Sequence, residues 1–268
     1  MAANEKGHRL LEVSGLTMDF GGLRAVDDVG LDIFEGEIVA LIGPNGAGKT
    51  TFFNCVTGIY EPTRGDVKIH PPGGNTRRIN GMKPNRITAL GMARTFQNIR
   101  LFPAMTVLEN VMIGRHCRTR TSIVDAILGL RKAAIEEQET VDASYQLLKK
   151  VGLEKFAGEF SRNLPYGDQR RLEIARALAT DPFLLLLDEP AAGMNPHETH
   201  ELDALITRIR DEEKVAILLI EHDMKLVMNI SDRIYVMEYG KKIAQGTPLE
   251  IKENPKVIEA YLGEEAHA

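Results

Sequence analysis

The sequence predicts an α/β fold with a mainly parallel central sheet, an antiparallel β subdomain near the N-terminus and an inserted α-helical subdomain. Continuously apolar runs at 38–42, 183–187 and 215–220 are typical of strands that are covered on both faces. Helical segments separate these runs, as crossover connections in a parallel sheet require. From residue 10 up to the first run, apolar residues alternate with polar ones and Gly-rich turns, which favours antiparallel strands.

The elements follow in chain order from these patterns. The strand at 38–42 leads through a glycine-rich loop into a helix, "TTFFNCVTGI". From about 105 to 160 the composition favours helices, and one helical face is formed by Val141, Tyr145, Leu148 and Val151. The last strands form a hairpin around residues 239–240, and the tail 251–265 predicts one short helix. We interpret 71–81, "PPGGNTRRING", as a flexible turn with no assignable role.

Composition sets limits on the function. Of the 268 residues, 43% are apolar and 26% charged, as in ordinary globular proteins. The net charge of −5 argues against nucleic acid as the main partner, because phosphate backbones require a basic face. No apolar run approaches the ~20 residues that cross a bilayer, and the polar N-terminus has no secretion core. Cys55 and Cys117 have neither disulfide nor metal-ligand spacing, which favours reduced thiols in a cytosolic protein.

The glycine-rich loop predicts a phosphate site. "GPNGAGKT" at 43–50 matches G-x-x-x-x-G-K-[ST] between a buried strand and a helix. Its glycines let main-chain N–H groups approach an anion, and the helix that starts near Gly48 adds its positive end. Lys49 supplies charge to the outer phosphates and Thr50 a hydroxyl to Mg²⁺. The candidate phosphate-binding residues are Gly43, Pro44, Asn45, Gly46, Ala47, Gly48, Lys49, Thr50 and Thr51.

An acidic pair ends the second apolar strand. "FLLLLDEP" places Asp188 and Glu189 at a carboxyl strand end, where open α/β sheets bind ligands. Asp188 is suited to the ligand shell of Mg²⁺. Glu189 can polarise an attacking water. Together with the loop, this pair indicates nucleotide hydrolysis.

The chain resembles the ATP-binding subunits of ABC transporters over nearly its whole length. The segments that carry the resemblance, in the family's order, are "GPNGAGKTT", "RTFQ", "LPYGDQRRLEIARAL", "LLLLDEP" and "IEHD". Within the family it is similar to the LivG-type ATPases of branched-chain amino acid importers. "FGGLRAVDDV", "DEPAAGMNP" and "EHDMKLVMNISDRIYV" carry that closer likeness.

The resemblance implies roles for three isolated residues. Phe20 stands where the family stacks an aromatic ring on adenine; many members have Tyr there, and Phe keeps the π face. Gln97, in "RTFQ", stands where a glutamine senses Mg²⁺ and the γ-phosphate and links to the membrane subunit. His222 stands where a histidine contacts the γ-phosphate. Alone, a histidine at this position is more often structural.

The segment "LPYGDQRRLEIARALA" stands where the family has its signature, Leu-Ser-Gly-Gly-Gln, which reaches the ATP of a second subunit. Here the resemblance implies that Tyr166, Gly167 and Asp168 make the contact with that ATP. We expect Gly167 just before a helix that carries an apolar stripe. Pro165 offers neither a hydroxyl nor an N–H. We expect Asp168 to point outward, because its charge repels phosphate. Asn195 replaces a frequent Asp, which leaves that residue's role across the dimer open.

The resemblance also implies the architecture: a P-loop NTPase (RecA-like) core within a single ABC ATPase domain, 1–268. We expect the nucleotide-binding core at 1–97 and 171–268, the helical signature subdomain at 98–170 and a helical tail at 247–268. ATP and Mg²⁺ are the implied cofactors. Lys49, Glu189 and His222 are the expected catalytic residues, and Thr50, Gln97 and Asp188 the expected metal ligands.

The implied function is the ATP-hydrolysing subunit of an importer of branched-chain amino acids, peripheral on the cytoplasmic side of the inner membrane. The implied partners are transmembrane permease subunits, a second ATPase subunit, either a paralogue or an identical chain, in a head-to-tail dimer, and indirectly a periplasmic binding protein. Urea or short amides stay open as cargo. A soluble ABC-type ATPase for cofactor assembly is the alternative. A simple P-loop kinase leaves the signature segment and His222 unexplained.

Overall fold

The computed structural model describes residues 7–118 and 131–265. Contacts divide the chain into two compact units, of which the first comprises Met1–Arg94 and Phe183–Ala268 and the second Thr95–Pro182. The second unit overlaps the insertion that the sequence predicts at 98–170, and its last helix runs without a break through residue 171. Within the described residues, no helix is long and apolar enough to span a membrane.

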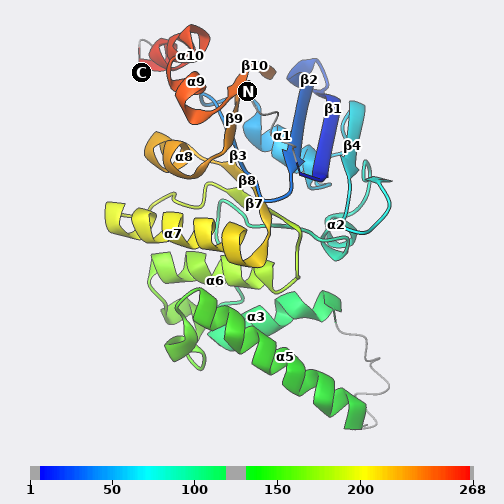
Figure 1. The fold of residues 1–268 in the computed structure, drawn as a ribbon, viewed down its shortest axis with the longest axis vertical. Helices are drawn as coiled ribbons and strands as arrows, with labels where there is room; N and C mark the ends of the chain where they lie inside the picture. The colour runs from blue at the N-terminus through cyan, green and yellow to red at the C-terminus, as the bar shows by residue number, and fades with distance from the viewer. Residues whose placement is uncertain (1–6, 119–130, 266–268) are drawn as a thin grey trace. The chain divides into compact units, whose positions relative to one another are not determined.

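The first unit contains an antiparallel sheet of order β2-β1-β4-β5 (Figure 1). Its strands are β1 (Arg9–Phe20), β2 (Leu23–Phe34), β4 (Arg64–Ile69) and β5 (Arg77–Arg78). The alternating pattern before residue 38 therefore predicts β1 and β2 correctly. The 71–81 segment is more ordered than expected, because it includes β5 and because Asn80 accepts the Val67 N–H and donates to the Gly65 carbonyl.

The same unit contains a six-stranded sheet of order β10-β9-β3-β8-β7-β6. Its strands are β3 (Ile38–Ile42), β6 (Met92–Arg94), β7 (Leu184–Asp188), β8 (Ala216–Ile220), β9 (Arg233–Glu238) and β10 (Lys241–Gly246). All neighbours pair in parallel except β10, which forms the predicted antiparallel hairpin with β9. The expected α/β class with a mainly parallel sheet is confirmed.

The apolar run of β3 is continuous because both of its faces are buried. Val39 and Leu41 lie in the large core that the antiparallel sheet and the first helix share with this face of the parallel sheet. Ala40 and Ile42 lie in a second cluster, with residues of the C-terminal helices. A strand packed on both sides has no polar positions, so it shows no alternation.

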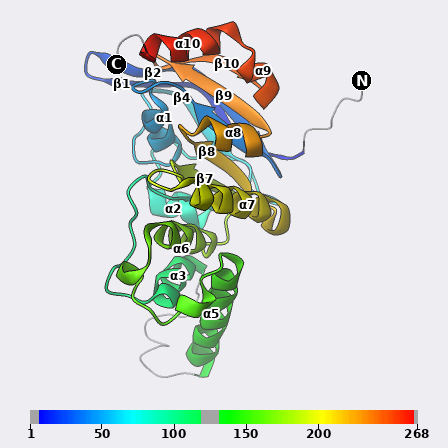
Figure 2. The same cartoon turned by 90° about the vertical axis from the view of Figure 1, so that its left-hand side faces the viewer.

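Helices complete the first unit. They are α1 (Lys49–Val56), α2 (Pro84–Ala89), α7 (Pro196–Glu213), α8 (Met224–Ile230), α9 (Pro248–Lys252) and α10 (Pro255–Glu265). Figure 2 shows α9 and α10 beside β9 and β10, consistent with their contacts, and α8 contacts α9. The tail is two helices rather than the single one expected, because α9 ends at Lys252 and Pro255 starts α10.

The second unit is helical. It contains α3 (Val107–Arg115), α5 (Arg131–Lys150) and α6 (Tyr166–Leu178), with short 3₁₀ turns at His116–Arg118, Glu154–Phe156 and Ser161–Asn163. The three helices pack on one another. The predicted buried face is wrong at Tyr145, which is 36% exposed, whereas Ser144 and Leu148 are fully buried. Residues at i, i+3 and i+7 share a helical face just as residues at i, i+4 and i+7 do, so periodicity fits Ser144 as well as Tyr145. The packing of the neighbouring helices decides which of the two is buried.

Candidate functional site

The candidate residues of the first unit gather at one edge of the parallel sheet. The loop 43–48 follows β3, Asp188 ends β7 and His222 comes two residues after β8. These strands are adjacent, in the order β3-β8-β7, and run in parallel. Their carboxyl ends therefore meet at the same edge, which is where open α/β sheets bind ligands.

Two glycines of the phosphate loop have no room for a side chain. A Cβ on Gly43 would lie 2.0 Å from the Met237 carbonyl oxygen. A Cβ on Gly48 would lie 2.4 Å from the Ala25 carbonyl oxygen, and Gly48 has a φ of 93°, in the left-handed region. Gly48 is also the N-cap of α1 and has no side chain to cap it. The first turn of α1 therefore has no side-chain cap at its N-terminus, the end of a helix that favours an anion.

Lys49 is buried within its own loop. Its side chain is 6% exposed, and its ammonium donates to the carbonyl oxygens of Gly43 (2.6 Å) and Pro44 (2.8 Å). A buried ammonium needs such partners, because an unpaired charge is costly in the interior. The neighbouring Asn45, Gly46 and Thr50 are exposed. The cation thus lies at the base of a loop whose tip faces solvent.

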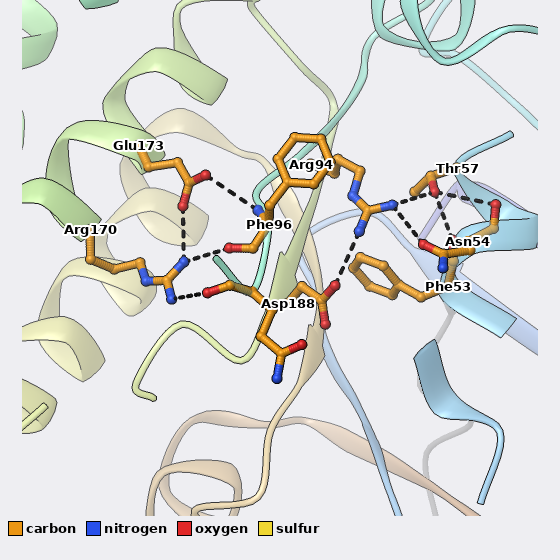
Figure 3. A network of polar contacts seen from close by, with 9 residues as sticks. Phe53, Asn54, Thr57, Arg94, Phe96, Arg170, Glu173 and Asp188 are labelled. Carbon is orange, nitrogen blue, oxygen red and sulfur yellow. Dashed lines mark hydrogen bonds and ion pairs between the residues drawn. The ribbon is translucent and has the colours of Figure 1, made fainter. Parts of the chain in front are cut away.

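Asp188 is held by Arg94, for which the sequence predicts no role (Figure 3). The Arg94 guanidinium contacts Asp188 Oδ2 at 3.1 Å, and Asp188 is 4% exposed. Arg94 also donates to Asn54 Oδ1 (3.1 Å) and Thr57 Oγ1 (2.8 Å) of α1 and its C-cap, and stacks 5.1 Å from the Phe53 ring. The arginine therefore ties the acidic strand end to the helix that follows the phosphate loop. The sequence feature that points to Arg94 is its position at the start of "RTFQ".

Glu189 and His222 are in direct contact. His222 Nε2 lies 2.8 Å from Glu189 Oε1, and a ring protonated at Nε2 donates this hydrogen bond. Glu189 has a φ of 46°, the left-handed region, which costs a non-glycine residue about 1 kcal/mol or more. The histidine is half-exposed and the glutamate largely covered. Two of the three residues expected to be catalytic thus form one pair at the sheet edge.

Glu221 is a second carboxylate beside this pair. It is 3% exposed and accepts the N–H groups of Ala191 (2.7 Å), His222 (2.8 Å) and Asp223 (3.3 Å). Burial raises the pKa of Glu221, and the charge of Glu189 adds to this, whereas the three N–H groups oppose it. The motif "IEHD" contains this residue, but its spacing alone assigns it no role.

Phe20 lies at the end of β1 and is 42% exposed. Its ring meets Tyr60 edge to face, with centroids 5.3 Å apart and planes at 81°. Tyr60, 37% exposed, follows α1. An exposed ring that is supported by a second ring is suited to stacking on a flat base. Tyr60 was not among the expected residues, since no motif includes it.

In the second unit, the backbone around Gln97 is anchored by a buried ion pair (Figure 3). Arg170 and Glu173 of α6 are 0% and 1% exposed and lie 2.9 Å apart. Arg170 donates to the carbonyl oxygens of Phe96 (2.6 Å) and Gln97 (2.8 Å). Glu173 accepts the N–H of Phe96 at 3.4 Å, and burial raises the pKa of its carboxyl. The Gln97 segment is therefore attached to α6, while the Gln97 side chain is exposed.

The signature segment forms the first turn of α6. Gly167 lies inside this turn and not just before the helix as expected, because α6 begins at Tyr166. Pro165 is the N-cap and makes no capping bond with its side chain. Asp168 pairs with Arg171 at 2.6 Å, which neutralises its charge along the helix. Arg170 contacts the Tyr166 hydroxyl at 3.4 Å.

Asn195 has a structural role in the first unit. Its side chain accepts the N–H groups of His197 and Glu198, each at 3.0 Å, and Glu198 accepts the Asn195 N–H at 2.9 Å. This reciprocal capping box starts α7. The capping role accounts for an asparagine here without any contact to a ligand, since Asn and Asp cap helices equally well.

The donor set suits a hard cation only in part. Within the described residues, no group of three or more His, Cys, Asp or Glu side chains could hold a metal ion. The first unit offers the Thr50 hydroxyl and the Asp188 carboxylate, both oxygen donors of the kind that Mg²⁺ prefers. Mg²⁺ usually takes one or two protein ligands and completes its shell with water and substrate phosphates. The residues therefore fit a metal that arrives with a nucleotide.

Family models match two parts of the chain. A model described as "ABC transporter" matches residues 26–192, and one described as "Branched-chain amino acid ATP-binding cassette transporter" matches 241–267. The chain is 51% identical to the high-affinity branched-chain amino acid transport ATP-binding protein LivG of Salmonella typhimurium. That alignment covers 95% of this chain and 98% of the relative.

Solved structures are similar over the same extent. The ADP conformation of an ATP-binding cassette from an ABC transporter superposes with a TM-score of 0.81 at 30% identity, covering 95% of this chain and 99% of that one. A dimeric cassette in a post-hydrolysis state, bound to ADP and Pi, has a TM-score of 0.74 at 25% identity, covering 89% and 99%.

Proposed function

Because the chain belongs to the ABC transporter family, as one of its ATP-binding subunits, we propose that the carboxyl edge of its parallel sheet is an ATPase site. The Glu189–His222 contact is the observation that carries this proposal. A carboxylate in contact with an imidazole, beside a loop suited to phosphates, is an arrangement for activating water against a phosphoryl group. ATP hydrolysis is the family's activity, and it agrees with this chemistry.

The phosphates bind in the loop 43–51. N–H groups of the loop and of the first turn of α1 donate to them, and Lys49 leaves its carbonyl partners to contact the outer phosphates. Phe20, supported by Tyr60, stacks on adenine. The phosphate site is therefore built mainly from main-chain donors, which need no reorganisation during the reaction.

Glu189 accepts a proton from the attacking water. His222 holds the glutamate carboxylate in place and, as the resemblance implies, contacts the γ-phosphate. Thr50 and Asp188 would hold Mg²⁺, which when bound neutralises charge on the phosphate oxygens. Arg94 keeps Asp188 oriented through their ion pair. The residues of this chain thus divide between binding, orientation and proton transfer.

A second ATPase subunit completes the site. In the proposed dimer, the first turn of α6 with Tyr166, Gly167 and Asp168 faces the nucleotide of the other chain. The dimeric cassette with ADP and Pi supports such an assembly for this fold. The partner is a paralogue or an identical chain. Transmembrane permease subunits, which the resemblance implies, receive the motion through the helical unit and the Gln97 segment.

The cargo is branched-chain amino acids, delivered by a periplasmic binding protein. The LivG relative and the match of residues 241–267 support this assignment and favour it over a soluble ATPase for cofactor assembly. We infer from this assignment that the chain is a peripheral subunit on the cytoplasmic side of the inner membrane. No residue of this chain contacts cargo in such a complex, so the assignment depends on the relatives.

The test is an ATPase assay on the chain purified with its membrane partners in vesicles. Leucine, isoleucine or valine, added with the binding protein on the opposite side, should raise the rate, and urea or acetamide should not. Stimulation by urea alone would overturn the cargo assignment. Purification without any membrane partner would favour the soluble alternative.

A further inference from the structure

Glu221 lies between the two loops that carry the proposed catalytic pair. It directly follows β8 and precedes His222, and its side chain is buried, with 3% exposed. Glu189 directly follows the end of β7, the neighbouring strand in the sheet. The two catalytic side chains therefore come from different loops, and their contact requires that both loops keep their positions.

Each oxygen of Glu221 serves one of these loops. Oε1 accepts the N–H of Ala191, two residues after Glu189, at 2.7 Å. Oε2 accepts the N–H of His222 at 2.8 Å and that of Asp223 at 3.3 Å. Bonds from N–H groups to a buried carboxylate are stronger than bonds between neutral groups. One side chain thereby joins the loop of the glutamate to the loop of the histidine.

The Glu189 backbone shows why such support is needed. Its φ of 46° lies in the left-handed region, which a residue with a side chain adopts only where its surroundings enforce it. The Glu189 N–H donates to the Ile220 carbonyl at 2.9 Å, and the Ala191 N–H donates to Glu221. Both bonds connect this turn to the end of β8.

We propose that Glu221 is a positioning residue for ATP hydrolysis, which holds Glu189 and His222 in contact and so sets the turnover number and not ATP affinity. This inference rests on the proposed function of the pair. Glu221 itself touches neither substrate nor the reacting water. A carboxylate is required, because a glutamine in its place has one acceptor oxygen, and its NH₂ group would face the N–H groups of one loop.

The experiment compares three variants of the full chain with its partners: Glu221→Gln, Glu189→Gln and Glu37→Gln. Glu37 is the matched control, because its carboxylate also accepts a backbone N–H, that of Phe34 at 2.9 Å, and it precedes β3 at the opposite end of the strand from the site. The readouts are kcat, ATP affinity by calorimetry and the ¹⁵N signal of the His222 ring. That signal is identified as the one that is missing from the spectrum of His222→Gln.

We expect Glu221→Gln to lower kcat by roughly 10- to 100-fold, with ATP affinity unchanged within about twofold, as for other supports of a catalytic group. The His222 signal should move towards that of Glu189→Gln, since the same contact is lost. Glu37→Gln should leave kcat and the His222 signal as they are. Full kcat in a folded Glu221→Gln, or a drop equal to that of Glu37→Gln, would overturn the inference.

Failure of the inference is distinguishable from failure of the proposed function. If Glu189→Gln hydrolyses ATP like the unaltered chain, the proposed catalytic pair is wrong. If Glu189→Gln is inactive while Glu221→Gln is fully active, only the positioning role is wrong. Should Glu221→Gln not fold, amide hydrogen exchange in the unaltered chain decides: slow exchange at Ala191 and His222 is expected, and unprotected amides there would contradict the proposal.

Discussion

Lys49 illustrates how a single residue serves two states of the site. Its ammonium is satisfied by the Gly43 and Pro44 carbonyls, so the loop keeps its cation buried and in place. Triphosphate oxygens offer a stronger, charged acceptor, and exchanging one set of partners for the other leaves no charge unpaired. The residue therefore contributes to nucleotide affinity without a desolvation cost at the moment of binding.

The Lys49→Ala variant should consequently bind ATP more weakly. A hydrogen bond to a charged group contributes about 1.5–3 kcal/mol, which is roughly 10- to 100-fold in affinity. Calorimetry on the purified chain measures this directly. The control is Lys241→Ala, since Lys241 is exposed and pairs with Asp27 on the surface. Equal ATP affinity of Lys49→Ala and the unaltered chain would contradict the proposal that this loop binds the phosphates.

Single residues also show which parts of the site a sequence can predict. The loop 43–50 and the pair Asp188–Glu189 are contiguous, so their spacing alone indicates phosphate chemistry. Arg94 and Glu221 escaped prediction, although both lie in recognised motifs. Their partners are far away in the chain: Arg94 contacts Asp188, and Glu221 contacts Ala191. A contact between distant residues depends on the fold, and spacing does not encode it.

Among the elements, the start of α7 explains why the chain has Asn195 where the family frequently has Asp. Asn195 caps the helix and exchanges hydrogen bonds with Glu198. The capping box satisfies N–H groups of the first turn that have no partner within the helix. The substitution of a frequent Asp by Asn therefore preserves the start of α7.

We expect Asn195→Ala to lower the free energy of unfolding by about 1 kcal/mol, since alanine cannot accept the two N–H groups. ATP affinity should not change. Urea denaturation and calorimetry on the same preparation measure both. His197→Ala, at an exposed position of the same turn, should be neutral within about 0.5 kcal/mol. A loss of ATP affinity with unchanged stability would assign Asn195 to the nucleotide instead of the helix.

Elements with local signals are the ones that the sequence predicts correctly. The β9–β10 hairpin follows from alternation around residues 239–240, and α1 from its place after the loop. The buried face of α5 was wrong at Tyr145, and the tail divides at Pro255. Helical periodicity shows that a face exists, but neighbouring helices decide which residues occupy it.

For the molecule as a whole, a buried thiol and a buried phenol make the free energy of unfolding depend on pH under alkaline conditions. Burial raises the pKa of the Cys55 thiol from 9.0 to about 11. Burial and the hydrogen bond to Asp32 raise the pKa of Tyr235 from 10.0 to about 12. In the unfolded chain both groups ionise at their ordinary values, so the unfolded state loses protons first as the pH rises.

The free energy of unfolding should therefore fall as the pH rises above about 9, through the window that ends near the folded pKa of Cys55. Urea denaturation between about pH 8.5 and pH 10.5 measures the slope. In Cys55→Ala the slope should be smaller. In Cys117→Ala it should be unchanged, because Cys117 is exposed. A slope that is identical in Cys55→Ala and the unaltered chain would contradict this explanation.

The proposed ATPase site is tested most directly by Glu189→Gln in the assembled complex with Mg²⁺ and ATP. Glutamine keeps the shape of the side chain but cannot accept the proton of the attacking water, while the phosphate loop and Lys49 are untouched. Calorimetry and a phosphate-release assay are run on the same sample. We expect ATP binding equal to that of the unaltered complex and no measurable hydrolysis. Hydrolysis at the full rate, or loss of binding together with hydrolysis, would contradict the proposed site.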